Sequence, residues 1–154
     1  MYIEISGNTL TDAGGGISAS TMSPYDLIVH DNMLLRCGAG ITTSGANQNQ
    51  VEHNRLVGCG AGVRVVTDYT PNLIVGCVDV WNNDAGDWIG TPDPSGSSGN
   101  FSADPLFCDP DQDLTLAAAS PCLPGQHPYG WDCGTIGAFG QGCLVPVGAS
   151  GESA

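Results

Sequence analysis

A single pattern of apolar and polar positions occurs three times in the first 65 residues. In each copy an asparagine is followed two positions later by leucine and nine positions later by isoleucine or valine, and a β-branched residue precedes it by three. The repeated residues are Asn8, Asn32 and Asn54, then Leu10, Leu34 and Leu56, then Ile17, Ile41 and Val63, and upstream Ile5, Val29 and Val51. The asparagines are 24 and then 22 residues apart. A nearly fixed period in the low twenties predicts a solenoid, in which each repeat stacks on the next.

The repeat fits one coil of a right-handed parallel β-helix. Stacked coils lie one strand spacing apart, ~4.8 Å, so each position stands above its copy and the apolar columns point into a shared core. The asparagines mark a corner at which their amides can pair with backbone groups. A second corner, which needs positive φ or close backbone approach, is marked by Gly14, Gly16, Gly38, Gly40, Gly60 and Gly62. An antiparallel sandwich would explain the turns but not the columns, so we expect an all-β, single-stranded solenoid of about four coils.

The end of the stack is expected in a fourth, altered coil. Aligning Asp79 with Asn54 places Trp81 in the leucine column and Trp88 in the isoleucine/valine column. The following segment is rich in Pro, Gly and Ser, which favour turns. We therefore predict β-helix coils over residues 1–90, a loop and an irregular C-terminal cap over 91–143, and a flexible tail or linker over 144–154. Because the chain starts almost within a strand, at Tyr2, we also expect it to be part of a longer protein.

The charge of the chain excludes some classes of partner. It has no lysine and three arginines against sixteen acidic residues, for a net charge of −13. Binding to nucleic acid or to an anionic membrane needs basic residues, so neither is expected. The longest apolar run, near residues 73–77, is too short to span a bilayer, and we expect no membrane insertion.

The seven cysteines fall into two groups. Cys37 and Cys59 occupy one column in adjacent coils, where they form either a ladder of buried thiols or a disulfide. The other group is the set of expected disulfide partners in the cap, Cys108, Cys122, Cys133 and Cys143, with Cys77 expected to be unpaired. Disulfides in a poorly ordered cap indicate an oxidising compartment outside the cytoplasm.

Several motifs in the second half resemble bacterial secreted proteins with right-handed parallel β-helix repeats, of the pectate-lyase-like superfold. They are the segments Cys77–Asn83, Gly99–Phe107, Ser120–Cys122 and Ile136–Ala138. The resemblance implies the fold and an extracellular or cell-surface location. It implies no particular activity, because carbohydrate-active enzymes and proteins without assigned activity share this fold.

No outward row of side chains predicts an active site. His30 stands over Glu52, and Asp12 over Arg36, and both are interpreted as ion pairs between coils. A general acid/base role for His30 and Glu52 is the alternative. Arg55 and Arg64 have no matching carboxylates and are expected to be solvated.

One acidic loop is a candidate calcium site. Asp109, Asp111 and Asp113 place three carboxylates on alternate residues, and Ca²⁺ prefers such oxygen ligands. The loop lacks the glycine and the distal glutamate of an EF-hand. The alternative interpretation is a solvated acidic turn.

Two classes of function remain. The favoured one is a non-catalytic extracellular structural or adhesive module, which self-associates by stacking of coil edges. The other is a carbohydrate-binding or carbohydrate-active β-helix, with a surface polysaccharide as partner and its active site in coils upstream of Met1. The candidate sugar-binding aromatic residues are Tyr25, Tyr69, Tyr129 and Trp131.

Overall fold

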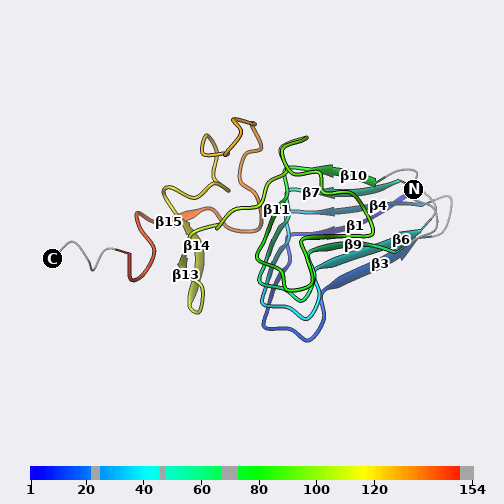
Figure 1. The fold of residues 1–154 in the computed structure, drawn as a ribbon, viewed down its shortest axis with the longest axis horizontal. Helices are drawn as coiled ribbons and strands as arrows, with labels where there is room; N and C mark the ends of the chain where they lie inside the picture. Colours follow the sequence, from blue (N-terminus) through cyan, green and yellow to red (C-terminus); the bar gives the residue numbers. More distant parts are fainter. Residues whose placement is uncertain (22–24, 46–47, 67–72, 150–154) are drawn as a thin grey trace.

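The repeats form a parallel β-helix, which confirms the predicted fold (Figure 1). A computed structural model describes residues 1–21, 25–45, 48–66 and 73–149. Each coil contributes one strand to each of three sheets, called A, B and C below. Sheet A contains β1 (Tyr2–Ser6), β4 (Asp26–His30), β7 (Asn49–Glu52) and β10 (Leu73–Gly76). Sheet B contains β2 (Thr9–Thr11), β5 (Met33–Leu35), β8 (Arg55–Val57) and β11 (Asp79–Trp81), and sheet C contains β3 (Ile17–Thr21), β6 (Ile41–Gly45), β9 (Val63–Val65) and β12 (Trp88–Ile89).

The interior is filled by the predicted columns. Leu10, Leu34 and Leu56 stand in register in sheet B, and Val80 continues their column. In sheet C, Trp88 stands over Val63, as predicted. Like shapes therefore stack on like shapes, and the inward column residues of the second and third coils are completely buried: Val29, Leu34, Ile41, Val51, Leu56 and Val63.

The register of the fourth coil differs from the prediction by one residue. Asp79 pairs with Arg55, so Val78 and not Asp79 takes the place of the corner asparagine. Trp81 consequently pairs with Val57 and faces outward, and its assignment to the leucine column was wrong. A fifth turn begins at Asn100, and Phe101 forms a bridge to Asp79.

Two corners of every coil use left-handed backbone. The residue before the corner asparagine has positive φ in each coil, as at Asp31 and His53, and so does the residue after each sheet B strand, as at Arg36. Of the predicted second-corner glycines, all except Gly14 allow close approach of the backbone of an adjacent coil, where a Cβ would not fit. A Cβ on Gly62 would overlap the carbonyl oxygen of Asp87 in the next coil.

The C-terminal cap packs against the outer face of sheet B (Figure 1). Outward side chains of β5 and β8, including Met33, Leu35 and Val57, form a second core with cap residues such as Phe107 and Ile136. The cap includes a small sheet of β13 (Phe107–Asp109), β14 (Asp113–Ala117) and β15 (Gln141–Cys143). The inner strands β5 and β8 of sheet B are thus buried on both faces, whereas β2 exposes Thr9 and Thr11. No helix in the described parts of the chain is long and apolar enough to cross a membrane.

Two disulfides hold the cap, and they correct the expected set. Cys108 pairs with Cys143 within the cap. Cys133 pairs with Cys77, which was expected to be unpaired, and so ties the cap to the fourth coil. Cys122 was expected in a disulfide but is a free, buried thiol of the cap, and its sulfur contacts Asp79 of sheet B and not another cysteine.

Candidate functional site

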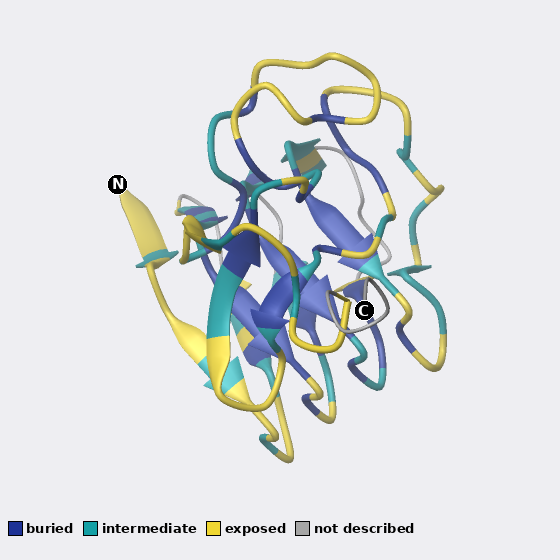
Figure 2. Ribbon diagram, turned by 90° about the vertical axis from the view of Figure 1, so that its left-hand side faces the viewer, coloured by how far each residue is buried: buried dark blue, intermediate teal, exposed yellow. Residues whose placement is uncertain are grey.

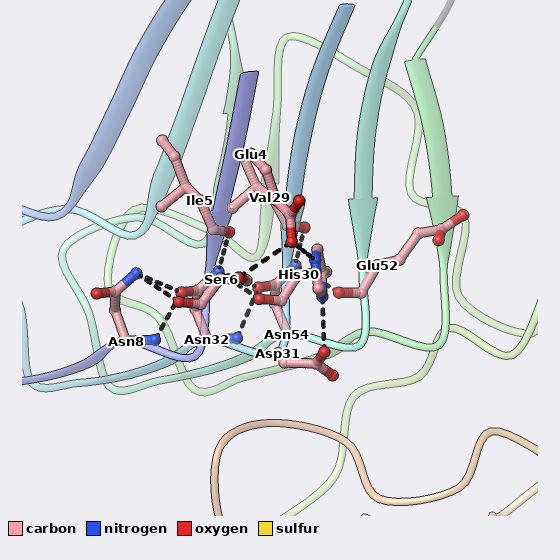
Figure 3. A network of polar contacts seen from close by, with 10 residues as sticks. All are labelled: Glu4, Ile5, Ser6, Asn8, Val29, His30, Asp31, Asn32, Glu52 and Asn54. Carbon is pink, nitrogen blue, oxygen red and sulfur yellow. Dashed lines mark hydrogen bonds and ion pairs between the residues drawn. The ribbon is translucent and has the colours of Figure 1, made fainter. Parts of the chain in front are cut away.

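The asparagines form a buried hydrogen-bonded ladder at the corner between sheets A and B (Figure 3). The Asn54 Oδ1 accepts the backbone N–H of Asn32 at 3.1 Å, and the Asn32 Oδ1 accepts that of Asn8 at 2.9 Å. The Asn54 Nδ2 donates to the carbonyls of Val29 at 2.7 Å and Glu52 at 2.9 Å. The amides of Asn32 and Asn54 thus each satisfy backbone groups of two coils, and we assign the ladder to structure and not to chemistry.

The stacked thiols have the same structural role at the next corner. Cys37 and Cys59 are both free and buried. The Cys59 thiol donates to the carbonyls of Leu34 and Val57, at 3.7 Å each. In the fourth coil Asn83 takes this column, and its Oδ1 accepts the Cys59 N–H at 2.8 Å. Burial raises the pKa of Cys59 to about 11, so it is a poor nucleophile at neutral pH.

His30 is held between two carboxylates on the outer face of sheet A (Figure 3). Its Nε2 lies 2.8 Å from Glu4 and its Nδ1 lies 2.6 Å from Asp31. The predicted partner Glu52 lies opposite His30 in the neighbouring strand β7. However, both ring nitrogens of His30 are hydrogen-bonded to Asp31 and Glu4 instead. Burial lowers the pKa of His30, but the hydrogen bonds to Asp31 and Glu4 outweigh it and raise the pKa overall. With both nitrogens occupied, His30 has no free atom for a substrate proton.

The predicted pair of Asp12 and Arg36 is confirmed, and it reaches the cap. Arg36 binds both carboxylate oxygens of Asp12, at 2.7 and 2.9 Å. The hydrogen bond from Arg36 lowers the pKa of Asp12. Arg36 also lies 3.1 Å from Asp111 and donates to the carbonyl of Pro110, so it connects the first two coils to the cap hairpin.

The three aspartates of the acidic loop are turned to separate partners. Asp109 accepts the backbone N–H of Asp111, Asp111 contacts Arg36, and Asp113 accepts hydrogen bonds from Thr115. Among the described residues no group of three His, Cys, Asp or Glu side chains is placed to hold a metal ion. Calcium binding here stays a prediction from the sequence.

A polar cluster that the sequence reasoning missed lies beneath the cap. Arg55 and Asp79, neighbours in adjacent strands of sheet B, are both 0 % exposed. Arg55 was expected to be solvated, and this was wrong because the cap covers its face of the sheet. Its guanidinium donates to the carbonyls of Ile136 and Phe139 and lies over the Phe107 ring, 5.5 Å from the ring centre.

The four candidate aromatic residues do not form one cluster among the described residues. Tyr25 directly precedes β4, whose first residue pairs with Tyr2, whereas Tyr129 and Trp131 belong to the cap loop between β14 and β15. Tyr69 lies outside the described residues. Trp81 lines an apolar groove of about 270 Å³ between sheet B and the cap.

Comparison with known families gives one match. Residues 2–83, just over half of the chain, match the family described as periplasmic copper-binding protein (NosD). None of the curated proteins and none of the solved structures compared with the chain matches it.

Proposed function

The chain belongs to the NosD family of periplasmic proteins, and we propose that it is a non-catalytic structural β-helix module that associates with a second copy through its first coil. The family supports a location outside the cytoplasm, and the two disulfides agree with an oxidising compartment. A non-catalytic role is supported by the polar side chains on the outer surface, which form ion pairs with one another. His30 pairs with carboxylates, and Arg36 pairs with Asp12 and Asp111.

The observation that carries the proposal is the open edge of the first coil. β1 pairs with β4, and no described strand pairs with its other side. Ile3 is 45 % exposed, whereas Leu27, above it in the same column, is 0 % exposed. Figure 2 shows the same contrast between the exposed N-terminal strand and the buried inner strands. An apolar strand edge with free backbone groups readily pairs with another strand.

The amide of Asn8 also faces this edge without its usual partners. In the inner coils, Oδ1 accepts an N–H from the preceding coil and Nδ2 donates to a carbonyl there, as Asn32 does to Ile5. Asn8 keeps two bonds that Asn32 also makes, to the carbonyl two residues back (Ser6) and to the Oδ1 of the next asparagine. It has no carbonyl of a preceding coil to donate to, and its own Oδ1 accepts no hydrogen bond from the described residues. A further strand at this edge would satisfy it.

For the chain of 154 residues taken alone, the occupant that we propose is the first coil of a second copy. In a longer protein, coils upstream of Met1 would occupy the same edge. At the far end of the stack, Phe101 already pairs with Asp79, and the Asn100 Oδ1 accepts the N–H of Val78. That end is therefore partly covered. Two first coils related by a two-fold axis would bury both open edges at once and give a closed dimer, not a filament.

The copper ligands of the chain do not fit a copper site. Copper is bound by imidazole nitrogen and by sulfur, and all three histidines and all seven cysteines lie among the described residues. Four cysteines are in disulfides, and the three free thiols are buried, with hydrogen bonds to backbone carbonyls or to Asp79. His30 and His127 have both ring nitrogens engaged, which leaves His53 as the lone donor among the histidines and cysteines. Of the methionines, Met1 is exposed, Met33 is buried in the second core, and Met22 lies outside the described residues. No copper chemistry is part of the proposed function.

Light scattering after size-exclusion chromatography tests the proposal. We expect a concentration-dependent species of twice the chain mass. Ile3→Lys places a charge in the apolar column at the interface and should give a monomer at every concentration. Tyr2→Lys adds the same charge on the outward side of β1 and should still dimerise. A wild-type monomer up to millimolar concentration would refute the proposal.

A second candidate function is binding of a neutral glycan by the cap loop. Tyr129 is 59 % exposed and Trp131 is 48 % exposed, and such aromatic faces stack well on sugar rings. The loop is held by buried His127, whose Nε2–H donates to the Gly99 carbonyl and whose Nδ1 accepts the Tyr129 N–H. A glycan array with wild type and Trp131→Ala tests this. Binding lost in the variant supports it, and no binding by wild type contradicts it.

A further inference from the structure

The contact between the cap and sheet B is built around a buried carboxylate. Asp79 is 0 % exposed and lies in an outward column of sheet B that the cap covers. Its Oδ1 accepts the backbone N–H of Ala103 at 3.1 Å, where the chain enters the cap. Its Oδ2 lies 3.1 Å from the thiol of Cys122, in the middle of the cap. One side chain therefore holds two separate parts of the cap.

The nearby cation does not neutralise this carboxylate directly. Arg55 is buried in the neighbouring strand, but its guanidinium donates to the carbonyls of Ile136 and Phe139. No ion pair between Arg55 and Asp79 lies within 4.0 Å. The partners of the Asp79 oxygens are thus an amide and a thiol, both neutral donors. A buried charge without a direct counter-ion is costly. A protonated carboxyl costs far less, because its O–H can donate to the Cys122 sulfur.

We propose that Asp79 is a proton-operated latch, which holds the cap on sheet B when it is protonated and loosens the cap when it loses its proton. The charged or titratable groups that face it are Arg55 from β8, Cys122 from the cap, and Asp87 from the loop after β11. Burial raises the pKa of Asp79 to about 7, against lowering by Cys122, Ala103 and Arg55, and Asp87 raises it further. The latch therefore changes state near neutral pH.

The disulfides keep the opening local. Cys77–Cys133 ties the cap to the fourth coil, and Cys108–Cys143 closes the cap sheet. Loosening around Cys122 would uncover the apolar outer face of sheet B, including Met33, without releasing the cap. What changes with pH is the exposure of that face, and Cys122 is a natural reporter of it.

Thiol labelling with 4,4′-dithiodipyridine tests the latch, because the reagent reacts in acid as well as at neutral pH. The oxidised protein is labelled between pH 5 and pH 8, and each site is read by mass spectrometry after digestion. Each rate is divided by the rate for the same cysteine in the denatured, disulfide-bonded chain, which removes the titration of the thiol itself. With an opened-state pKa near 4 and a closed-state pKa of about 7, the normalised Cys122 rate should rise roughly 100-fold over this range.

Two controls separate the latch from general unfolding. Cys37 and Cys59, in the β-helix core, should stay protected at every pH in the wild type. Asp79→Asn keeps the shape but cannot titrate, and it should make Cys122 labelling independent of pH. A wild-type Cys122 rate that is flat with pH, or that rises together with the rates of Cys37 and Cys59, would overturn the proposal even if the variant failed to fold.

Discussion

Replacement of Asn54 by alanine is the sharpest test of the asparagine ladder. Asn54 is 0 % exposed and its amide makes four hydrogen bonds, two to Asn32 and one each to the carbonyls of Val29 and Glu52. Alanine removes all four. The backbone N–H of Asn32 and the two carbonyls are then left without these partners in the interior.

The expected cost is large because these groups are buried. A buried group left without a partner costs about 1–3 kcal/mol. The Glu52 carbonyl still accepts the N–H of Asp31 at 3.4 Å, so the two other groups predict a loss of about 2–6 kcal/mol. That is a large share of the roughly 5–15 kcal/mol by which domains are stable. The matched control is Asn8→Ala. Asn8 is exposed in the first coil, and its side chain makes two hydrogen bonds. Its replacement by alanine should therefore lower the free energy of unfolding by about 1 kcal/mol or less.

Urea unfolding of the oxidised chain, followed by circular dichroism, measures both variants. If the ladder stabilises the coils, Asn54→Ala lowers the free energy of unfolding by at least about 2 kcal/mol more than Asn8→Ala does. Equal losses would mean that the ladder adds little, and that the packing of the apolar columns alone holds the coils together.

Three further predictions concern other parts of the fold. Cys59→Asn should raise the free energy of unfolding by about 1 kcal/mol, because its amide can bond the backbone as Asn83 does; a loss in urea unfolding would contradict this. Gly62→Ala should lower the melting temperature or prevent folding, since its Cβ would overlap the next coil, and a normal melt by calorimetry would refute the reasoning. The folded-state pKa of Asp79, about 7, lies above its unfolded value of 3.8, so its stabilisation is full below pH 3.8 and is lost as pH rises through 7. Compared with Asp79→Asn, the free energy of unfolding of the wild type should therefore fall by about 4 kcal/mol between pH 4 and pH 8 in urea titrations. A difference between the two proteins that does not change with pH would contradict the assignment.

Repetition made the inner part of the fold predictable. An inward residue must have a size and shape similar to those of the residue at the same position one coil away. The repeated Leu10, Leu34 and Leu56 therefore predict the stacking by themselves. The shift in the fourth coil was not predictable in the same way. Val78 replaces the asparagine there, and the left-handed corner at Cys77, which sets the register, leaves no distinct mark in the sequence.

The cap contacts were missed, although the sequence carried a signal for them. Met33-Leu34-Leu35 and Leu56-Val57 are consecutive apolar residues, whereas a strand with one solvated face alternates. This pattern indicates a sheet buried on both sides. It could have shown that the outward column of sheet B, and Arg55 with it, is covered. Which segment covers it, and that Cys77 pairs with Cys133, depends on contacts between distant residues that no local pattern encodes.

The molecular mass of the chain in solution, measured by light scattering across a range of concentrations, decides whether the first coil is an interface. Association through the open edge of β1 predicts a dimer that Ile3→Lys abolishes and Tyr2→Lys preserves. A monomer at all concentrations, or a dimer unaffected by Ile3→Lys, would contradict the assignment of the first coil as the interface.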